Sequence, residues 1–248
     1  MPDFDQHRIR NLLLRVMPPE AFLLLRPHME AVDLPLKHHL VESNRANASV
    51  YFIEHGLASI VATTLDDESI ECGHIGFEGM AGAHVVLKTD CSPMKTYMQI
   101  AGNGIIVPVG ILKDVLTKVP AADILLSNYV HTTEVQVAYS ALANGRYTMH
   151  ERLARWILMS HDRIEGDDLP LTHEFLSLML GVRRSGVTDE LHKLEGMWAI
   201  KATRGNIHVR NRKLLEEIAG GCYGGPENEY ERLLGVSPRR RYGPRVIP

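Results

Sequence analysis

Cysteine is scarce in this sequence, which contains only Cys72, Cys91 and Cys222, odd in number and far apart. They supply neither the even framework of a disulfide-stapled secreted domain nor a CxxC motif. No apolar run reaches the roughly eighteen residues that a membrane-spanning helix needs. The first residues also lack the basic-then-apolar plan of a secretory signal. We therefore expect a cytoplasmic protein that makes no membrane contact.

Catalytic and metal motifs are missing as well. The sequence has no P-loop, no HExxH and no recognisable pairing of a nucleophile with a base, and its thirteen histidines are scattered. Cys72 and His74, with His84 and Cys91 further along, are of the types that bind zinc or haem, but their spacing is irregular. A cysteine in a strand is more often a small buried apolar residue. We predict no enzyme activity, no metal and no cofactor.

Positive charge is concentrated in one segment. The chain has a formal net charge of −3, yet residues 172–213 contain eight Lys/Arg against four Asp/Glu. A basic patch on an acidic protein is typical of local contact with nucleic-acid phosphates, whereas a solvated surface is the simpler alternative.

Short β-branched and aromatic runs fill the first hundred residues. Runs 49–56 and 57–64 are followed by the acidic turn 66–68 and by further short runs near 96–100 and 104–109. Strands at this spacing predict an antiparallel sandwich or small barrel. Helical patterns precede them at 8–16 and 20–28.

After Pro120 the pattern becomes helical. Residues 121–144 contain no Gly or Pro, and their apolar positions recur at helical spacing. A helix of this length exceeds what one small domain covers, which favours pairing with a second copy, although a helix lying on its own sheet is the alternative. The predicted dimer seam comprises Leu126, Val130, Thr133, Val137 and Ala141.

These patterns predict an α+β fold with four parts: an antiparallel β domain with short N-terminal helices (1–120), which the resemblance described below makes a β-roll effector-binding-like domain, a long dimerisation helix (121–145), a domain at 146–220 and a disordered basic tail (221–248). The signals described next make 146–220 a winged helix-turn-helix DNA-binding domain.

The helix-turn-helix is predicted from local signals. Thr172 caps a helix, Gly181 supplies a turn residue tolerant of positive φ, and a second helix spans about 183–195. Runs 198–201 and 206–210 alternate polar and apolar residues, which predicts a β-hairpin wing. In such units the second helix enters the major groove.

We expect Arg184 to read a guanine, because arginine binds guanine O6 and N7 bidentately. Asp189 is suited to cytosine N4 or to pairing with a neighbouring cation. The predicted DNA contacts are Arg183, Arg184, Ser185, Thr188, Asp189, His192, Lys201, Arg204 and Arg210, of which Arg183, Lys201, Arg204 and Arg210 are assigned to phosphates.

The segment 179–195 resembles the recognition motif of the CRP/FNR family of bacterial transcription regulators, and the resemblance extends from about Leu12 to Arg210. It implies a cyclic-nucleotide-binding-like β-roll, a long dimerising helix and a winged helix, in that order. Arg184 falls on the family's usual base-reading arginine. Ser185 and Asp189 replace the glutamate and second arginine of the cyclic-AMP-responsive members, which implies a different operator.

The effector region departs from that family. The segment 73–77 looks like the start of its phosphate-binding cassette, but His74 stands where a glutamate contacts the ribose, and 91–95 contains no arginine for the phosphate. Loss of a bidentate cation removes a strong charge-assisted pair, which argues against a cyclic nucleotide. The effector-pocket residues implied by the resemblance are Gly73, His74, Gly76, Phe77 and Lys95.

The sequence thus predicts a homodimeric, sequence-specific transcription regulator whose partner is double-stranded DNA with a palindromic operator. RNA polymerase is an additional candidate partner. The alternative is a ligand-sensing signalling module whose winged helix contacts protein.

Overall fold

A computed structural model describes residues 4–239 of the chain. Its N-terminal part is an antiparallel β-roll in which neighbouring strands run in the order β1-β6-β3-β4, with β2 also paired to β6 and β5 to β3. The strands are β1 (Glu30–Leu34), β2 (His39–Val41), β3 (Ser49–Thr63), β4 (Ser69–Ile75), β5 (Met80–Ala81) and β6 (Lys95–Pro108). The expected antiparallel β-roll is therefore confirmed.

Two long strands, β3 and β6, form the centre of the roll and bend together. Their pairing shifts register between Ile53 and Ala58. Gly56 lies there at φ +89°, and a Cβ on Gly102 would come within 1.9 Å of the backbone oxygen of His55. Only glycine allows so close an approach of two backbones at a bend.

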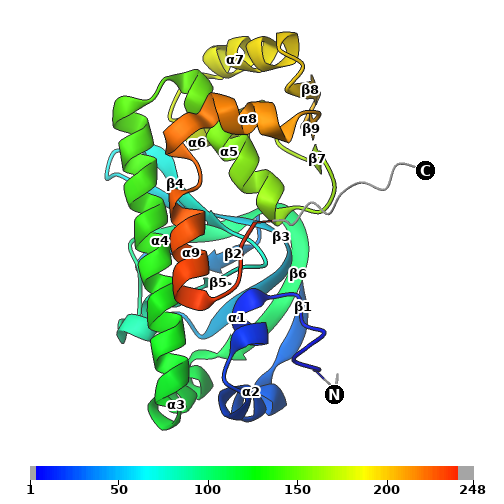
Figure 1. Cartoon of the computed structure of the whole chain (residues 1–248). Helices are drawn as coiled ribbons and strands as arrows, with labels where there is room; N and C mark the ends of the chain where they lie inside the picture. Colours follow the sequence, from blue (N-terminus) through cyan, green and yellow to red (C-terminus); the bar gives the residue numbers. More distant parts are fainter. Residues whose placement is uncertain (1–3, 240–248) are drawn as a thin grey trace, which may run out of the picture.

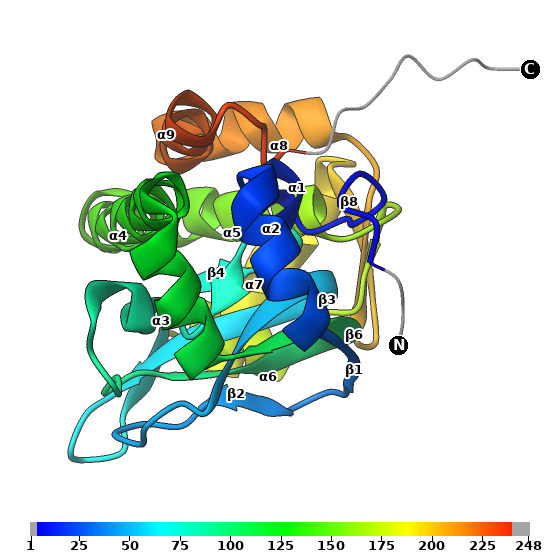
Figure 2. The same cartoon turned by 90° about the horizontal axis from the view of Figure 1, so that it is seen from below.

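Short helices close one open side of the roll. They are α1 (Leu12–Val16), α2 (Pro19–Leu25), the 3₁₀ turn η1 (Arg26–His28), the 3₁₀ turn η2 (Ala83–Leu87) and α3 (Val109–Lys118). Figure 2 shows α1, α2 and α3 on the same side of the sheet as the long helix α4 (Pro120–Arg146). The main core lies between this helical layer and the sheet.

Helix α4 runs the length of the molecule (Figure 1). One of its faces packs on the sheet, one lies under the C-terminal segment and one is uncovered. Leu126 and Val130 pack into the β-roll core with 0% and 7% of their surface exposed. Their prediction as dimer-seam residues is therefore wrong, because their side chains are already used within the chain. Although α4 is 27 residues long, no helix within residues 4–239 is long and apolar enough to cross a membrane.

The predicted winged helix-turn-helix is present after a joint at Tyr147 and Thr148. Its elements are α5 (Met149–Arg163), β7 (Asp168–Leu169), α6 (His173–Leu180), α7 (Arg184–Gly196), β8 (Ile200–Thr203), β9 (Asn206–Val209) and α8 (Arg212–Ala219). The strands pair in the order β7-β9-β8. A second core of buried apolar side chains holds this part together.

The C-terminal segment is folded where disorder was predicted. A 3₁₀ turn, η3 (Gly220–Cys222), leads into α9 (Gly225–Leu234), which returns along α4 (Figure 1). The glycines and proline that suggested disorder instead start the helix, since Gly224 adopts φ +100° and Pro226 occupies its first turn. The expectation for residues 240–248 lies outside the described residues.

Candidate nucleic-acid interface and ligand cavity

The helix pair α6–α7 is built by local capping. The Thr172 hydroxyl accepts a hydrogen bond from the Phe175 amide at 3.2 Å, and Gly181 ends α6 at φ +61°. Helix α7 then starts at Arg184 and buries Val187, Leu191 and Leu194 in the second core. Its remaining faces are left at the surface, so the helix is supported from beneath and presented outward.

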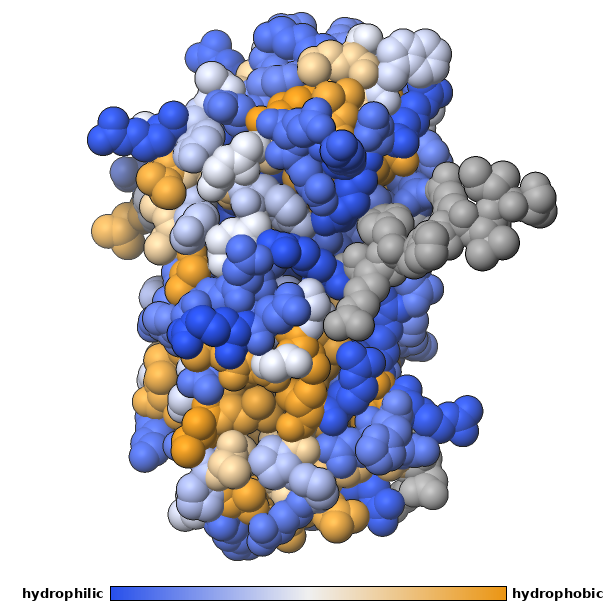
Figure 3. Space-filling view, viewed as in Figure 1, coloured by the Kyte–Doolittle hydropathy of each residue, from blue (hydrophilic) through white to orange (hydrophobic). Residues whose placement is uncertain are grey.

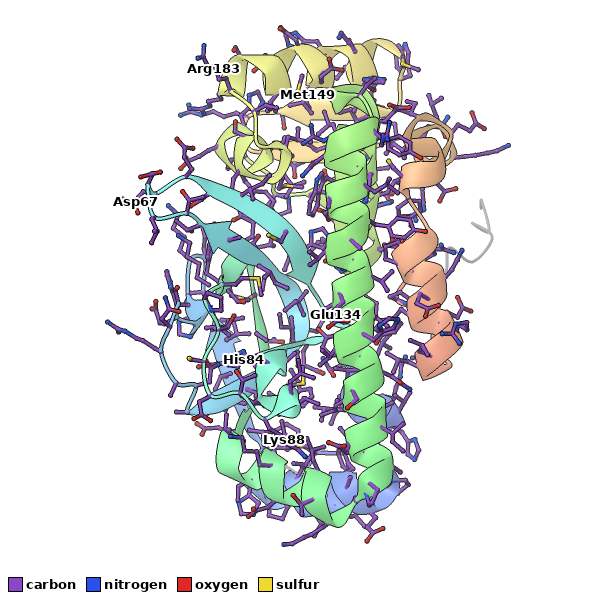
Figure 4. The ribbon with its side chains drawn as sticks, turned by 90° about the vertical axis from the view of Figure 1, so that its left-hand side faces the viewer. Asp67, His84, Lys88, Glu134, Met149 and Arg183 are labelled. Atoms are coloured by element: carbon purple, nitrogen blue, oxygen red, sulfur yellow. The ribbon has the colours of Figure 1, made fainter. Side chains whose placement is uncertain are left out.

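A groove of about 710 Å³ separates α7 from the wing formed by β8 and β9. Of the nine predicted DNA contacts, Arg184, Thr188, His192 and Arg204 line it. Arg183, Ser185 and Asp189 are exposed near the start of α7 but do not line the groove. In Figure 4, Arg183 lies at the upper edge of the molecule, at the start of α7.

The start of α6 contributes residues that the sequence analysis missed. Thr172 and His173 line the same groove, and His173 Nδ1 lies 3.1 Å from the Thr188 hydroxyl. That hydroxyl also donates to the Arg184 carbonyl at 3.2 Å, which fixes its position. The sequence signal that could have identified them is the Thr172 cap, because it marks a helix N-terminus, and a helix N-terminus at a surface groove can bind phosphate.

On the underside of α7, Glu190 is tied to its neighbours. Its carboxylate accepts from Lys193 Nζ at 2.7 Å and lies 2.9 Å from His150 Nδ1. Burial raises the pKa of Glu190, but these two partners outweigh burial and hold the pKa below its ordinary value. The acidic side chain therefore neutralises Lys193 and joins α7 to α5.

The wing carries the other predicted phosphate contacts. Lys201 pairs with Glu195 at 3.1 Å, so its charge is partly satisfied within the chain. Arg204 is exposed beside Gly205, which adopts φ +76° at the hairpin tip. Arg210 stacks over the exposed ring of Trp198, 5.0 Å from its centre. Among the described residues, Arg183, Arg184 and Arg204 form no ion pair, and their charge faces outward.

Residues 151–218 match the family described as a Crp-like helix-turn-helix domain. The chain carries a Crp-like helix-turn-helix domain. The match covers α5 to α8, so it includes both the recognition helix and the wing.

Solved structures extend the likeness to the whole fold around the Crp-like domain. FixK2 from Bradyrhizobium japonicum is 15% identical, with a TM-score of 0.68 over 78% of this chain and 98% of its own. The c-di-GMP-responsive global regulator CLP of Xanthomonas campestris is 14% identical, with a TM-score of 0.61 over 76% and 97%. A CRP-family transcriptional regulator from Thermus thermophilus is 16% identical, with a TM-score of 0.62 over 77% and 97%. No curated protein matches the sequence. These likenesses establish the CRP/FNR fold.

A second hollow lies between the β-roll and α4, away from the Crp-like domain. Its volume is about 220 Å³. Figure 4 looks onto this side of the molecule, where His84 of η2 and Glu134 of α4 lie on opposite sides of the hollow. The lining residues are Val41, Ile60, Ile75, Met80, Gly82, Ala83, His84, Leu87, Ser92, Met94, Thr96, Tyr129, Val130, Thr133 and Glu134. Among the residues that the structure describes, this lining is mostly apolar and includes no lysine or arginine.

The predicted effector-pocket residues Gly73, His74, Gly76, Phe77 and Lys95 are absent from that lining. This cavity therefore lends no support to the predicted effector pocket, which stays a prediction. Successive side chains of a strand point to opposite faces, so Ile75 faces the cavity while His74 faces α5. The turn that borders the cavity begins later, at Gly82, which adopts φ +87° before η2.

His74 instead belongs to a buried polar junction between the β-roll and the Crp-like domain. Its ring meets that of Trp156 edge-on at 5.0 Å, and its amide donates to Gln136 Oε1 at 2.8 Å. Glu71 and Arg155 of the same junction are each 1% exposed. Across residues 4–239, no three His, Cys, Asp or Glu side chains are grouped to hold a metal.

Proposed function

We propose that this protein is a homodimeric transcription regulator that binds a palindromic DNA operator through its Crp-like domain. The observation that carries the proposal is the groove between α7 and the wing, where Arg184, Thr188, His192 and Arg204 share one space. Acting on the bacterial chromosome places it in the cytoplasm.

Within this proposal, α7 enters the major groove and one DNA strand follows the groove between α7 and the wing. Arg184 reads guanine bidentately, with Thr188 and His192 beside it. Arg204 and the start of α6 at His173 hold phosphates on either side. Arg183 adds a phosphate contact at the start of α7.

Dimerisation is assigned to the uncovered face of α4 seen in Figure 4. Exposed residues repeat there with the alternating three- and four-residue spacing of a coiled coil: Ile124, Ser127, His131, Glu134, Ala138, Ala141 and Gly145. Of the predicted seam, Ala141 lies on this stripe and the exposed Val137 borders it, while the half-buried Thr133 faces the cavity. Two such helices related by a twofold axis would place two recognition helices on one side of the dimer.

For the effector, the cavity favours a small, uncharged and largely apolar molecule over a cyclic nucleotide. Within residues 4–239, the lining offers no lysine or arginine for a phosphate. His84 lines the cavity, and its Nε2 is buried without a hydrogen-bond partner among the described residues. Burial lowers the pKa of His84, against a hydrogen bond with the Asp90 backbone that raises it. The neutral ring therefore offers Nε2 to a hydroxyl or N–H donor on the ligand.

Selection of bound sequences from a random double-stranded DNA pool tests the main proposal. We expect an enriched palindrome and an affinity that falls steeply between low and high salt, by about 0.9 in the log–log slope for each phosphate contact. Failure to enrich any sequence, with an affinity indifferent to salt, would favour the alternative of a signalling module whose winged helix contacts protein.

Calorimetry with phenol, toluene and cyclic AMP tests the effector assignment. Phenol should bind more tightly than toluene, and His84→Leu should abolish the difference while leaving toluene binding intact. Tight binding of cyclic AMP would contradict it.

A further inference from the structure

Helix α9 joins the two cores of the molecule. Tyr230 and Leu234 lie in the β-roll core, with 4% and 7% of their surfaces exposed. A few residues earlier, Cys222 is buried in the core of the Crp-like domain. The segment therefore leaves one domain, crosses the joint between α4 and α5, and ends in the other. Below α9, an apolar area spreads between α4 and α1 (Figure 3), where Leu233 and Val236 pack at the rim of the core.

One polar contact of α9 reaches Glu78, in the turn after β4. The Tyr230 hydroxyl donates to the Glu78 carbonyl at 2.6 Å. The Glu78 carboxylate accepts from Arg163 Nε at 2.7 Å and from the Gly76 amide at 3.0 Å. Thus α9 holds the backbone of Glu78, while its side chain holds Arg163, the last residue of α5.

The ion pair at this junction is removed from water. Glu78 and Arg163 are each 4% exposed. Burial would lower the pKa of Arg163, but the carboxylates of Glu78, Glu227 and Asp162 raise it above its usual range. Breaking a buried pair leaves an uncompensated charge, so the contact strongly favours one arrangement of the two domains.

The surfaces on both sides of the junction fit without spare room. A Cβ on Gly76 would lie 2.8 Å from Cβ of Arg163. On the other side, a Cβ on Gly225 would lie 2.3 Å from the ring of Tyr139 on α4. Close packing of this kind has discrete arrangements rather than a continuous range.

The joint that α9 spans is short. Only Tyr147 and Thr148 separate α4 from α5, and Thr148 caps α5 through a reciprocal hydrogen-bond pair with Glu151. Since α5 is rigid from its cap to Arg163, holding Arg163 fixes the angle between α5 and α4. The recognition helix α7 contacts α5 and follows that angle.

We propose that α9 and the Glu78–Arg163 pair form a clamp that sets the angle between α4 and α5, and through it the spacing of operator half-sites that the dimer accepts. This inference rests on the proposed function, because half-site spacing has meaning only for a DNA-binding dimer. Tyr230, Glu78 and Arg163 are positioning residues that touch no DNA.

The test compares Tyr230→Ala with Tyr230→Phe and with Glu231→Ala, which changes an exposed residue of the same helix. Each protein is titrated with operators whose half-sites are moved apart or together by one base pair, about a tenth of a helical turn. Wild type and Glu231→Ala should discriminate against the altered spacings about tenfold, a difference of about 1.4 kcal/mol. Tyr230→Ala should lose most of this discrimination while keeping its affinity for a single half-site, and Tyr230→Phe should fall between.

Hydrogen exchange on the same proteins separates the outcomes. In Tyr230→Ala, amides of 225–234 and of the last turn of α5 should lose protection, while those of α6 and α7 keep it. If α9 is released and the spacing preference is unchanged, the clamp is refuted. If wild type enriches no operator, the proposed function fails, and unchanged protection of α5 in Tyr230→Ala would then overturn the clamp separately.

Discussion

Glu71 Oε1 and His74 Nδ1 lie 3.4 Å apart on β4, and neither side chain reaches solvent. Burial raises the pKa of Glu71 well above its ordinary value, with the neighbouring Ser59 side chain and the charge of Arg155 opposing it. Burial also lowers the pKa of His74 well below its ordinary value, and the charges of Arg163 and Arg155 add to that. Both shifts favour the uncharged forms of the pair in the folded protein.

The two residues should give opposite pH dependences to stability. In Glu71→Gln, His74 remains neutral when folded, whereas the unfolded chain binds a proton below about pH 6.5. The free energy of unfolding should then fall, relative to wild type, as pH drops from about 7 to 5. In His74→Gln, Glu71 keeps a proton that the unfolded chain has lost, so stability should rise over the same range. Urea unfolding at several pH values measures both slopes, and slopes of the same sign would contradict the assignment.

Replacing Arg184 by alanine should relax specificity at one base pair of each half-site and cost about 1–3 kcal/mol of binding free energy. The reason is the loss of a bidentate contact to a base edge. The neighbouring Arg183→Ala is the matched control, because a phosphate contact lowers affinity for every sequence alike. Binding-site selection with both variants measures the difference, and an unchanged preference in Arg184→Ala would refute its role as base reader.

Arg204→Ala should weaken binding to all sequences and reduce the salt slope by about 1 per half-site, because the role proposed for the wing tip is to contact phosphate without reading bases. Lys118→Ala removes the same charge at the end of α3, opposite to α7 in Figure 1, and should change neither quantity. Titrations at several salt concentrations measure the slope. Equal effects of the two variants would show that net charge alone is responsible.

Ala141→Glu should weaken dimerisation, because it places like charges against each other across the uncovered stripe of α4. Affinity for the palindrome should fall with it, while affinity for one half-site stays. Ala101→Glu makes the same change on an exposed position of β6. Sedimentation measures the dimer, and an intact dimer in Ala141→Glu would place the interface elsewhere.

The helix-turn-helix was predictable because its signals are local. The Thr172 cap and the left-handed Gly181 each act within a few residues, and the structure has both. The alternation that predicted a hairpin wing corresponds to β8 and β9. The β-roll was predictable for the same reason, since the signals for strands and glycine turns are also local in the sequence.

The buried and uncovered faces of α4 and the lining of the cavity could not be predicted as well, because each depends on which distant segments pack against them. Helix α4 has one face on the sheet, one under α9 and one uncovered, so its apolar positions form no single stripe. Leu126 and Val130 fit the helical period, but they lie on the face of α4 that packs against the sheet. The position of His74 depends on which face of β4 points toward the cavity. The short glycine-rich turn at 76–79 gives no indication of that face in the sequence.

The order of the elements along the chain means that the clamp is synthesised after the Crp-like domain. The core of the Crp-like domain extends to Cys222, whereas Tyr230 lies beyond it. During synthesis the DNA-binding domain therefore leaves the ribosome before the helix that secures it, and domains fold in that order. A chain whose translation stops early in α9 would retain every proposed DNA contact and lack the proposed clamp. Under the proposed function, such a product would compete for single half-sites without occupying the operator as a matched pair.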